Sequence, residues 1–250
     1  MKEGKEKDTK KEKTTKMGKK GSNWKSMKGM ILRNPVESRK KSAREKNPEK
    51  SVSAKTKSSL EDLLNPDGTG TRSLTPVIAM DCEMVGVGNK GDSALARVSV
   101  VNSYGALLYD SFVKPPSKVT DYRTEFSGVR KEDLEGDHAV SLREAQDKVV
   151  KLMKNRIIVG HSISNDLEAL MLKHPRHLIR DTALYEPLMY TNSVGKKKSQ
   201  KLSILFENEF HIPIQDGEHD SVDDARACLL IYKKYRKQWE DFLSNHKKSA

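Results

Sequence analysis

The sequence predicts an α/β fold, in which one mixed β-sheet is flanked by helices and preceded by a basic tail. Three observations support this prediction. Strand-like runs alternate with helical patterns over residues 76–250. Residues 1–75 show no sustained hydrophobic period. The 250-residue chain has a hydrophobic content of 35%, which is low for a chain that is folded throughout.

Nearly all of the excess positive charge lies in the tail. Residues 1–75 hold 21 basic and 10 acidic residues, a net charge of +11, whereas residues 76–250 hold 26 and 25, a net charge of +1. A segment rich in Lys, Ser, Thr and Glu is typical of disorder. We therefore expect a disordered tail over 1–75 and one domain over 76–250. The tail could contact RNA, DNA or nuclear proteins, carry a nuclear or nucleolar address, or serve only as a solubilising extension.

Composition also argues against several classes of protein. Two cysteines, Cys82 and Cys228, make neither a disulfide framework nor a zinc cluster. No apolar run approaches the roughly 20 residues that span a bilayer, and the N-terminus has no apolar region typical of a secretory signal. We expect an intracellular protein without membrane contacts, and the net charge of +12 suggests an anionic partner.

Local patterns predict the elements in order. Strands are expected over 77–85, 94–102 and 106–113, with a hairpin turn over 102–105 between the last two. A helix capped by Ser141, a short strand over 156–160, a helix over 165–172 and a strand over 177–182 follow. The chain then predicts a helix over 202–210 and a long helix that begins at Ser221. In the tail, Ser59 before three leucines predicts one capped helical turn.

The first chemically informative stretch is the strand with the sequence VIAMDCEMVGVG. Residues two apart in a strand face the same way, so Asp81 and Glu83 project together and Cys82 projects to the opposite face. Two adjacent carboxylates are costly to bury, and a hard divalent cation such as Mg²⁺ or Mn²⁺ removes that cost. The alternative is a strand end at which both acids face water.

The second stretch, IIVGHSISNDLEALML, joins an apolar strand to a helix. Asp166 lies in the first turn of that helix, where an acid is also favoured by the helix dipole. His161 is either a catalyst or a packed histidine at a strand end. Asp181, at another strand end, is a further carboxylate that the pattern does not exclude.

The third stretch is GEHDSVDDARACLLIY, at the start of the long helix. Asp224 shares a helix face with Cys228, on the inward side, whereas Asp223 points away from it. Asp224 could also complete a capping box with Ser221. His219, flanked by acids, could act as a general base near neutral pH. Spacing alone leaves the choice between His219 and His161 open.

Taken together, three acid-bearing segments at strand ends and helix starts predict phosphoryl chemistry at two metal ions. The motifs in MDCEMVGVG, LARVSVVN, TDYRTEFSGV, GHSISNDL, IRDTALY and HDSVDDARA resemble those of the DEDDh 3′→5′ exonucleases, in particular the RNA exonuclease 4 branch, which includes the interferon-stimulated exonucleases. The resemblance covers about residues 76–235 and implies a ribonuclease-H-like fold. A lysine-containing insertion, residues 195–198, departs from the family pattern.

The resemblance also implies functional residues. It places the four metal-binding acids on Asp81, Glu83, Asp166 and Asp224 and the catalytic histidine on His219. It further implies that Met84 lies beside the terminal nucleotide and that Arg123 contacts its ribose or phosphate. Two Mg²⁺ or Mn²⁺ ions would support hydrolysis that releases nucleoside 5′-monophosphates from single-stranded RNA.

The same motifs leave two competing functions. One is the same hydrolysis on DNA, and the other is an inactive RNA-binding or assembly factor that keeps the fold. The resemblance favours RNA processing, such as ribosomal-RNA maturation, in the nucleus and its nucleolus. We expect Lys196, Lys197, Lys198 and the basic tail to guide the rest of the RNA strand.

Overall fold

The computed structural model describes residues 60–215 and 217–247. Most of the predicted basic tail, including Ser59, lies outside the described residues. Within the described part, no helix combines the length and the apolar character that a membrane span requires.

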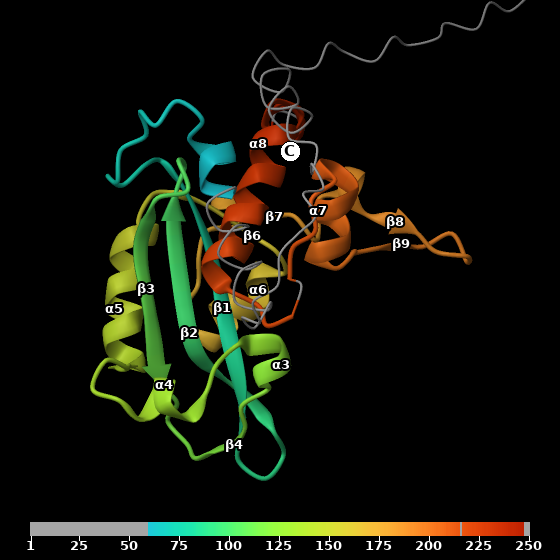
Figure 1. Cartoon of the computed structure of the whole chain (residues 1–250). Coiled ribbons are helices and arrows are strands. Elements are labelled where there is room, and N and C mark those ends of the chain that lie inside the picture. Colours follow the sequence, from blue (N-terminus) through green and yellow to red (C-terminus); the bar gives the residue numbers. More distant parts are fainter. Residues whose placement is uncertain (1–59, 216, 248–250) are drawn as a thin grey trace, which may run out of the picture. The chain divides into compact units, whose positions relative to one another are not determined.

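A seven-stranded mixed sheet forms the centre of the domain (Figure 1). Its strands are β1 (Val77–Val87), β2 (Asp92–Asn102), β3 (Leu107–Lys114), β4 (Val119–Asp121), β5 (Val140–Ser141), β6 (Ile157–Gly160) and β7 (Ile179–Asp181). Strands run in the order β5-β3-β2-β1-β6-β7, and β4 also pairs with β1. The β1–β2–β3 meander is antiparallel, whereas β6 runs parallel to β1 and β7 parallel to β6. The α/β prediction is confirmed.

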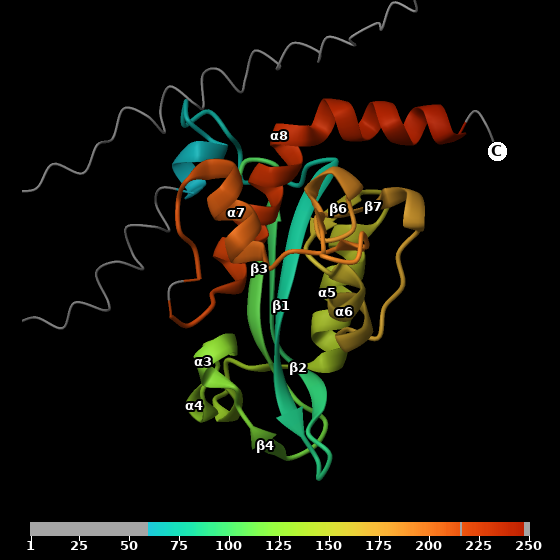
Figure 2. The same cartoon turned by 90° about the vertical axis from the view of Figure 1, so that its right-hand side faces the viewer.

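Helices lie on both faces of this sheet (Figure 2). The α-helices are α3 (Thr124–Ser127), α4 (Lys131–Glu135), α5 (Leu142–Met153), α6 (Ile163–Ala169), α7 (Leu202–Phe210) and α8 (Ser221–Lys247). Two 3₁₀ turns, η1 (Arg176–Leu178) and η2 (Glu186–Leu188), flank β7, and a separate hairpin pairs β8 (Tyr190–Thr191) with β9 (Lys197–Lys198). The N-cap predicted at Ser141 is confirmed, since its hydroxyl accepts from the Glu144 backbone N–H, and Glu144 completes a capping box.

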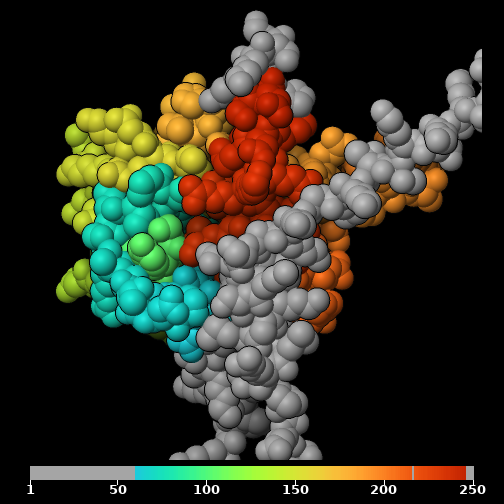
Figure 3. Space-filling view, turned by 90° about the horizontal axis from the view of Figure 1, so that it is seen from above, coloured from blue at the N-terminus to red at the C-terminus, as the bar shows by residue number. Residues whose placement is uncertain are grey.

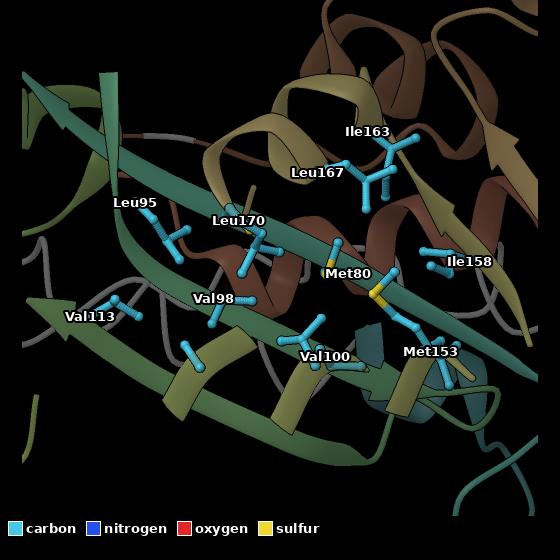
Figure 4. Close-up of a cluster of buried hydrophobic side chains, with 14 residues drawn as sticks. Met80, Leu95, Val98, Val100, Val113, Met153, Ile158, Ile163, Leu167 and Leu170 are labelled. Carbon is cyan, nitrogen blue, oxygen red and sulfur yellow. The ribbon is translucent and has the colours of Figure 1, made fainter. Parts of the chain in front are cut away.

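Alternation along β1 separates the hydrophobic core from the acids. Met80 and Cys82 point into an apolar cluster with Val149 of α5 and Leu167 of α6, and Figure 4 shows the Met80 and Leu167 side chains in this layer. Asp81 and Glu83 therefore project to the other face, which α8 covers. Because Met80 and Cys82 are buried on one face of the strand, Asp81 and Glu83 must point to the opposite face.

The folded domain begins before the predicted boundary at residue 76. Residues 60–64 are helical, and their leucines are buried: Leu60, Leu63 and Leu64. Glu61 accepts a 2.6 Å hydrogen bond from Arg226 of α8, and the Asn102 side chain donates to the Thr71 carbonyl. Figure 3 shows this first described segment (cyan) beside α8 (red). Residues 60–75 are therefore part of the folded domain, and their assignment to the tail was wrong. The sequence places these leucines in a polar segment and does not show that their packing partners lie in the domain.

Candidate active site

Three carboxylates from two distant segments converge beside β1. Asp81 and Glu83 come from β1, and Asp224 comes from the first turn of α8. One oxygen atom of each carboxylate lies within 4.8 Å of one oxygen of each of the other two. Strand alternation and the inward face of α8, both read from the sequence, account for this convergence.

The start of α8 is held by groups other than Asp224. Asp220 caps the helix, because its Oδ1 accepts from the backbone N–H groups of Val222 and Asp223 at 3.1 and 3.3 Å. The Ser221 hydroxyl lies 2.6 Å from the Ser99 hydroxyl of β2. The capping box considered for Asp224 is therefore not formed, and its carboxylate is directed to the acidic cluster.

Burial of these like charges shifts their pKa values upward. Burial, followed by the charge of Asp166, raises the pKa of Asp81 well above its usual range. Burial and the charge of Asp224 raise the pKa of Glu83 to about 8, and burial raises that of Asp224 to about 7. Glu83 Oε1 is buried without a hydrogen-bond partner in the described part of the chain. An all-oxygen cluster with such an orphaned acceptor fits a hard divalent cation.

Asp166 approaches β1 from the α6 side and lies outside the group of three carboxylates. It is buried, and the neighbouring backbone and thiol of Cys82 act to lower its pKa. Burial raises the pKa of Asp166 to about 7, and its charge acts on Asp81. The fourth acid is thus near enough to Asp81 for a direct electrostatic effect.

Asp181 has a structural role instead. Its carboxylate accepts from the backbone N–H groups of Ser162 and Ile163, at 2.8 and 3.1 Å, and from that of Ala183 at 2.9 Å. These bonds satisfy free donors at the start of α6. Asp181, which the sequence left as a further candidate metal ligand, is therefore already engaged by backbone N–H groups.

His219 stands between the carboxylates and a cavity of about 690 Å³. Its Nδ1 lies 3.7 Å from Asp224 Oδ2, and burial together with the charge of Lys201 lowers its pKa. The cavity is also lined by Phe126, His161 and Lys201. Gly128, at φ +63°, allows the backbone of the α3 end to approach the His219 carbonyl, since a Cβ there would lie 2.8 Å from that oxygen.

Gln215 is a site residue that the sequence reasoning missed. Its side-chain amide donates a 2.8 Å hydrogen bond to Asp224 Oδ2, and the residue also lines the cavity. This bond orients the Asp224 carboxylate and opposes the upward shift of its pKa. Gln215 lies in an irregular segment between α7 and α8, where neither period nor capping pattern marks it.

The two histidines left open by spacing differ in their contacts. His161 uses both ring nitrogens, with Nδ1 2.9 Å from the Thr182 hydroxyl and Nε2 donating to the Gln200 carbonyl at 3.0 Å. His219 instead has a ring nitrogen beside Asp224. The geometry therefore favours His219 over His161 as the histidine that acts together with the acidic cluster.

The two predicted substrate contacts occupy different surroundings. Met84 follows Glu83 at a β-bulge of β1 and packs at the edge of the apolar cluster. The Arg123 guanidinium is not brought to the carboxylates, because it donates to the Ser93 hydroxyl and the Gly91 carbonyl, both at 2.9 Å. Arg123 thus ties the β1–β2 turn to the start of α3, and its contact with a nucleotide stays a prediction.

A family model described as an exonuclease, RNase T, matches residues 78–232, more than half of the chain. The chain belongs to this exonuclease family. The matched range contains all four acids and His219. The resemblance to the RNA exonuclease 4 branch of the DEDDh exonucleases is confirmed by curated relatives with that name.

Three of these relatives of the exonuclease domain come from distant organisms. RNA exonuclease 4 of Mycosarcoma maydis is 48% identical over 176 residues, which cover 69% of this chain and 46% of that protein. Those of Saccharomyces cerevisiae and Homo sapiens are 44% and 45% identical and cover 70% and 67% of this chain, but 60% and 39% of the relatives. The chain therefore aligns with about half the length of these relatives.

Solved structures support the ribonuclease-H-like exonuclease fold. The Pan2 catalytic unit of Neurospora crassa, with protease and nuclease domains, matches at a TM-score of 0.58 and 26% identity, over 72% of this chain and 30% of that chain. The Saccharomyces cerevisiae Pan2 pseudoubiquitin hydrolase–RNA exonuclease module in complex with AAGGAA RNA matches at 0.59 and 27%, over 72% and 32%. The exonuclease fold predicted from the sequence is confirmed.

Proposed function

We propose that the protein is a 3′→5′ exoribonuclease that releases nucleoside 5′-monophosphates. The observation that carries this proposal is the convergence of Asp81, Glu83 and Asp224, with His219 beside them at the rim of a cavity. Phosphodiester hydrolysis needs charge stabilisation at the phosphate and a base for the attacking water. Both requirements have candidates within this group of residues.

The acids are proposed to hold two divalent ions, Mg²⁺ or Mn²⁺. Asp81, Glu83 and Asp224 supply the converging oxygens, and Asp166 supports the second ion from the α6 side. When bound, such ions supply Lewis-acid stabilisation of the charge that develops on the phosphate. Gln215 keeps the Asp224 carboxylate oriented toward the cluster through its 2.8 Å hydrogen bond.

His219 is proposed to accept a proton from the attacking water. Because burial and Lys201 lower its pKa, the imidazole is neutral at pH 7 and has a free acceptor nitrogen. The adjacent Asp224 stabilises the imidazolium once the proton has moved. Met84, next to the acids of β1, is proposed to border the terminal nucleotide.

The names of similar proteins support RNA as the substrate. The curated relatives are RNA exonucleases, and one similar Pan2 module is described in complex with RNA. The Lys-rich N-terminal residues support a role in nuclear RNA processing, such as ribosomal-RNA maturation in the nucleolus. DNA is the nearest competing substrate, because it differs consistently by the missing 2′-OH.

A matched degradation assay tests this function. Single-stranded RNA and DNA 20-mers of the same sequence, labelled at the 5′ end, are incubated with the full chain in Mg²⁺, Mn²⁺ or EDTA. We expect the RNA to shorten from its 3′ end in either metal, with nucleoside 5′-monophosphates identified by chromatography, and no product in EDTA. Faster degradation of the DNA would contradict the RNA assignment, and no released mononucleotide from either strand would favour a binding or assembly factor.

A further inference from the structure

The β8–β9 hairpin is a built arm on the domain surface. Tyr190 pairs with Lys198 and Thr191 with Lys197. The Asn192 carboxamide oxygen holds the turn, accepting from the backbone N–H groups of Val194 and Lys196 at 3.1 and 2.9 Å. Figure 1 shows the hairpin projecting away from the sheet beyond α7. The ordered turn therefore fixes the backbone from which its lysines project.

The base of this hairpin is fixed to the candidate active site. Gln200, two residues after β9, accepts from His161 Nε2 through its carbonyl at 3.0 Å. Its side chain donates to the Leu188 carbonyl at 2.8 Å, before β8. His161 follows β6 and, like His219, lines the cavity. The hairpin and one wall of the cavity are therefore a continuous structure.

Positive charge runs along the same path. Lys196, Lys197 and Lys198 are exposed on the hairpin, and Lys201 lines the cavity, where its charge acts on His219. Lys197 lies 3.7 Å from Glu186, but both partners are largely exposed, so this pair contributes little. The lysines thus lead from the hairpin into the cavity.

We propose that the β8–β9 hairpin binds the backbone of single-stranded RNA on the 5′ side of the nucleotide held in the cavity. This inference rests on the proposed function, since an exonuclease that acts at the 3′ end leaves the rest of its strand on that side. Cross-strand partners share a face, so the half-exposed Tyr190 lies beside Lys198. An aromatic ring next to a cation is the combination that binds unstacked bases and phosphates.

A triple substitution tests the arm against a matched control. The first variant is Lys196→Ala/Lys197→Ala/Lys198→Ala, and the control is Lys148→Ala/Lys151→Ala/Lys154→Ala in and just after α5. The control removes the same charge from exposed lysines on the opposite side of the domain (Figure 1). Both are made in the full chain, so the basic N-terminal residues contribute equally.

Two measurements separate binding from hydrolysis. In EDTA, fluorescence anisotropy gives the Kd for a single-stranded RNA 20-mer. We expect the hairpin variant to bind about tenfold more weakly at 0.1 M salt, with a salt slope smaller by about 2 for three lost phosphate contacts. In Mg²⁺, its KM for the 20-mer rises by a similar factor, while kcat and the hydrolysis of an RNA dinucleotide are unchanged. The control should differ from wild type by less than about twofold in each quantity.

A second variant tests the aromatic ring. Tyr190→Ala should weaken binding of the 20-mer by about five- to tenfold, and Tyr190→Phe should restore it, because stacking needs the ring and not the hydroxyl. Equal losses in the hairpin and control variants, or an equal loss on the dinucleotide, would overturn the inference. If the hairpin variant binds RNA with wild-type affinity, the inference is also overturned. The lysines would then be expected to bind an acidic protein partner instead of RNA. If no substrate is hydrolysed but the hairpin variant still loses RNA affinity in EDTA, the proposed hydrolysis fails and the RNA-binding arm stands.

Discussion

Two groups of buried charges in this domain contrast with each other. In one group, an arginine meets its acids directly: Arg180 donates twice to Glu240 at 2.7 Å, and Arg226 pairs with Glu61 and Asp223. In the other, Asp81, Glu83 and Asp224 gather, and among the described residues no arginine or lysine forms an ion pair with them. The first is balanced by ion pairs within the chain, and the second is offset only in part, by the charge of Arg97.

An arginine whose charge reaches the cluster makes this contrast sharper. Arg97 lies opposite Glu83 in the β1–β2 register, yet its guanidinium binds Asp110 at 2.8 Å and Asp220 at 3.4 Å. The hydrogen bond from Arg180 lowers the pKa of Glu240, whereas burial raises that of Glu83 to about 8. The domain pairs Glu240 with an arginine but leaves this cluster without one, so an external cation can compensate its charge when the carboxylates ionise.

The largest expected effect comes from removing one acid of the cluster. Asp81→Asn and Asp224→Asn should each lower RNA hydrolysis in Mg²⁺ by at least about 10³-fold, because the charge stabilisation at the phosphate is lost. Their stability in EDTA should equal or exceed that of wild type, since a like charge has been removed. A quenched-flow or gel assay measures the rate of hydrolysis, and urea denaturation in EDTA measures the stability. Asp147→Asn on the exposed side of α5 is the control, and full activity in either cluster variant contradicts the site.

The next effect separates the base from the cation ligands. His219→Ala should slow hydrolysis by about 10²-fold, because a positioned general base contributes 10²–10⁴. Mn²⁺ binding measured by calorimetry should persist, since the carboxylates remain. The exposed His177→Ala variant is the control. Loss of Mn²⁺ binding in the His219 variant would place the histidine among the metal ligands.

Breaking a neutralised pair should affect folding instead of chemistry. Arg180→Met leaves Glu240 without its arginine and should lower the free energy of unfolding by about 2 kcal/mol. This figure is below that of a fully buried pair, because the Glu240 side chain is 34% exposed. Urea denaturation measures the change, with the exposed Arg176→Met as control. If Arg180→Met lowers the free energy of unfolding no more than the control does, the arginine-paired charges do not stabilise the fold, and the contrast with the acidic cluster is contradicted.

The smallest effect is a pH dependence confined to the acidic cluster. Glu83, with a pKa of about 8, and Asp224, with a pKa of about 7, bind protons in the metal-free folded state that the unfolded chain has already released. Stability in EDTA should therefore fall as pH rises from 6 to 8, by about 1 kcal/mol more in wild type than in Asp224→Asn. Comparing the two proteins cancels the contributions of titrating groups outside the cluster. Mg²⁺ should abolish it, and identical slopes in EDTA would contradict the shifted pKa values.

Elements with a strong local pattern could be predicted from the sequence. The helix over 202–210 and the start of the long helix at Ser221 agree with α7 and α8, because apolar spacing within each segment defines them. The helix predicted over 165–172 instead begins at Ile163 and ends at Ala169. Its start depends on Asp181, a cap from 18 residues later, and Met171 at φ 51° follows its end.

Short elements and loop contacts could not be predicted in the same way. Strands β5, β8 and β9 have two residues each and exist through their pairing partners. Within the site, the strand period and helix face indicated Asp81, Glu83 and Asp224. The roles of Gln215 and Asp220 depend on how the segment before α8 folds over the cluster, which no local period encodes.

The helical turn at residues 60–64 has a practical consequence for handling the protein. Leu64 covers Gly105 in the β2–β3 turn so closely that a Cβ there would lie 2.6 Å from it, and the Leu64 carbonyl accepts from Lys233 at 3.2 Å. A recombinant fragment cut at the start of the family match, residue 78, would uncover this apolar patch and leave Arg226 without Glu61. Expression of the nuclease region alone should therefore start upstream of Leu60 to avoid aggregation.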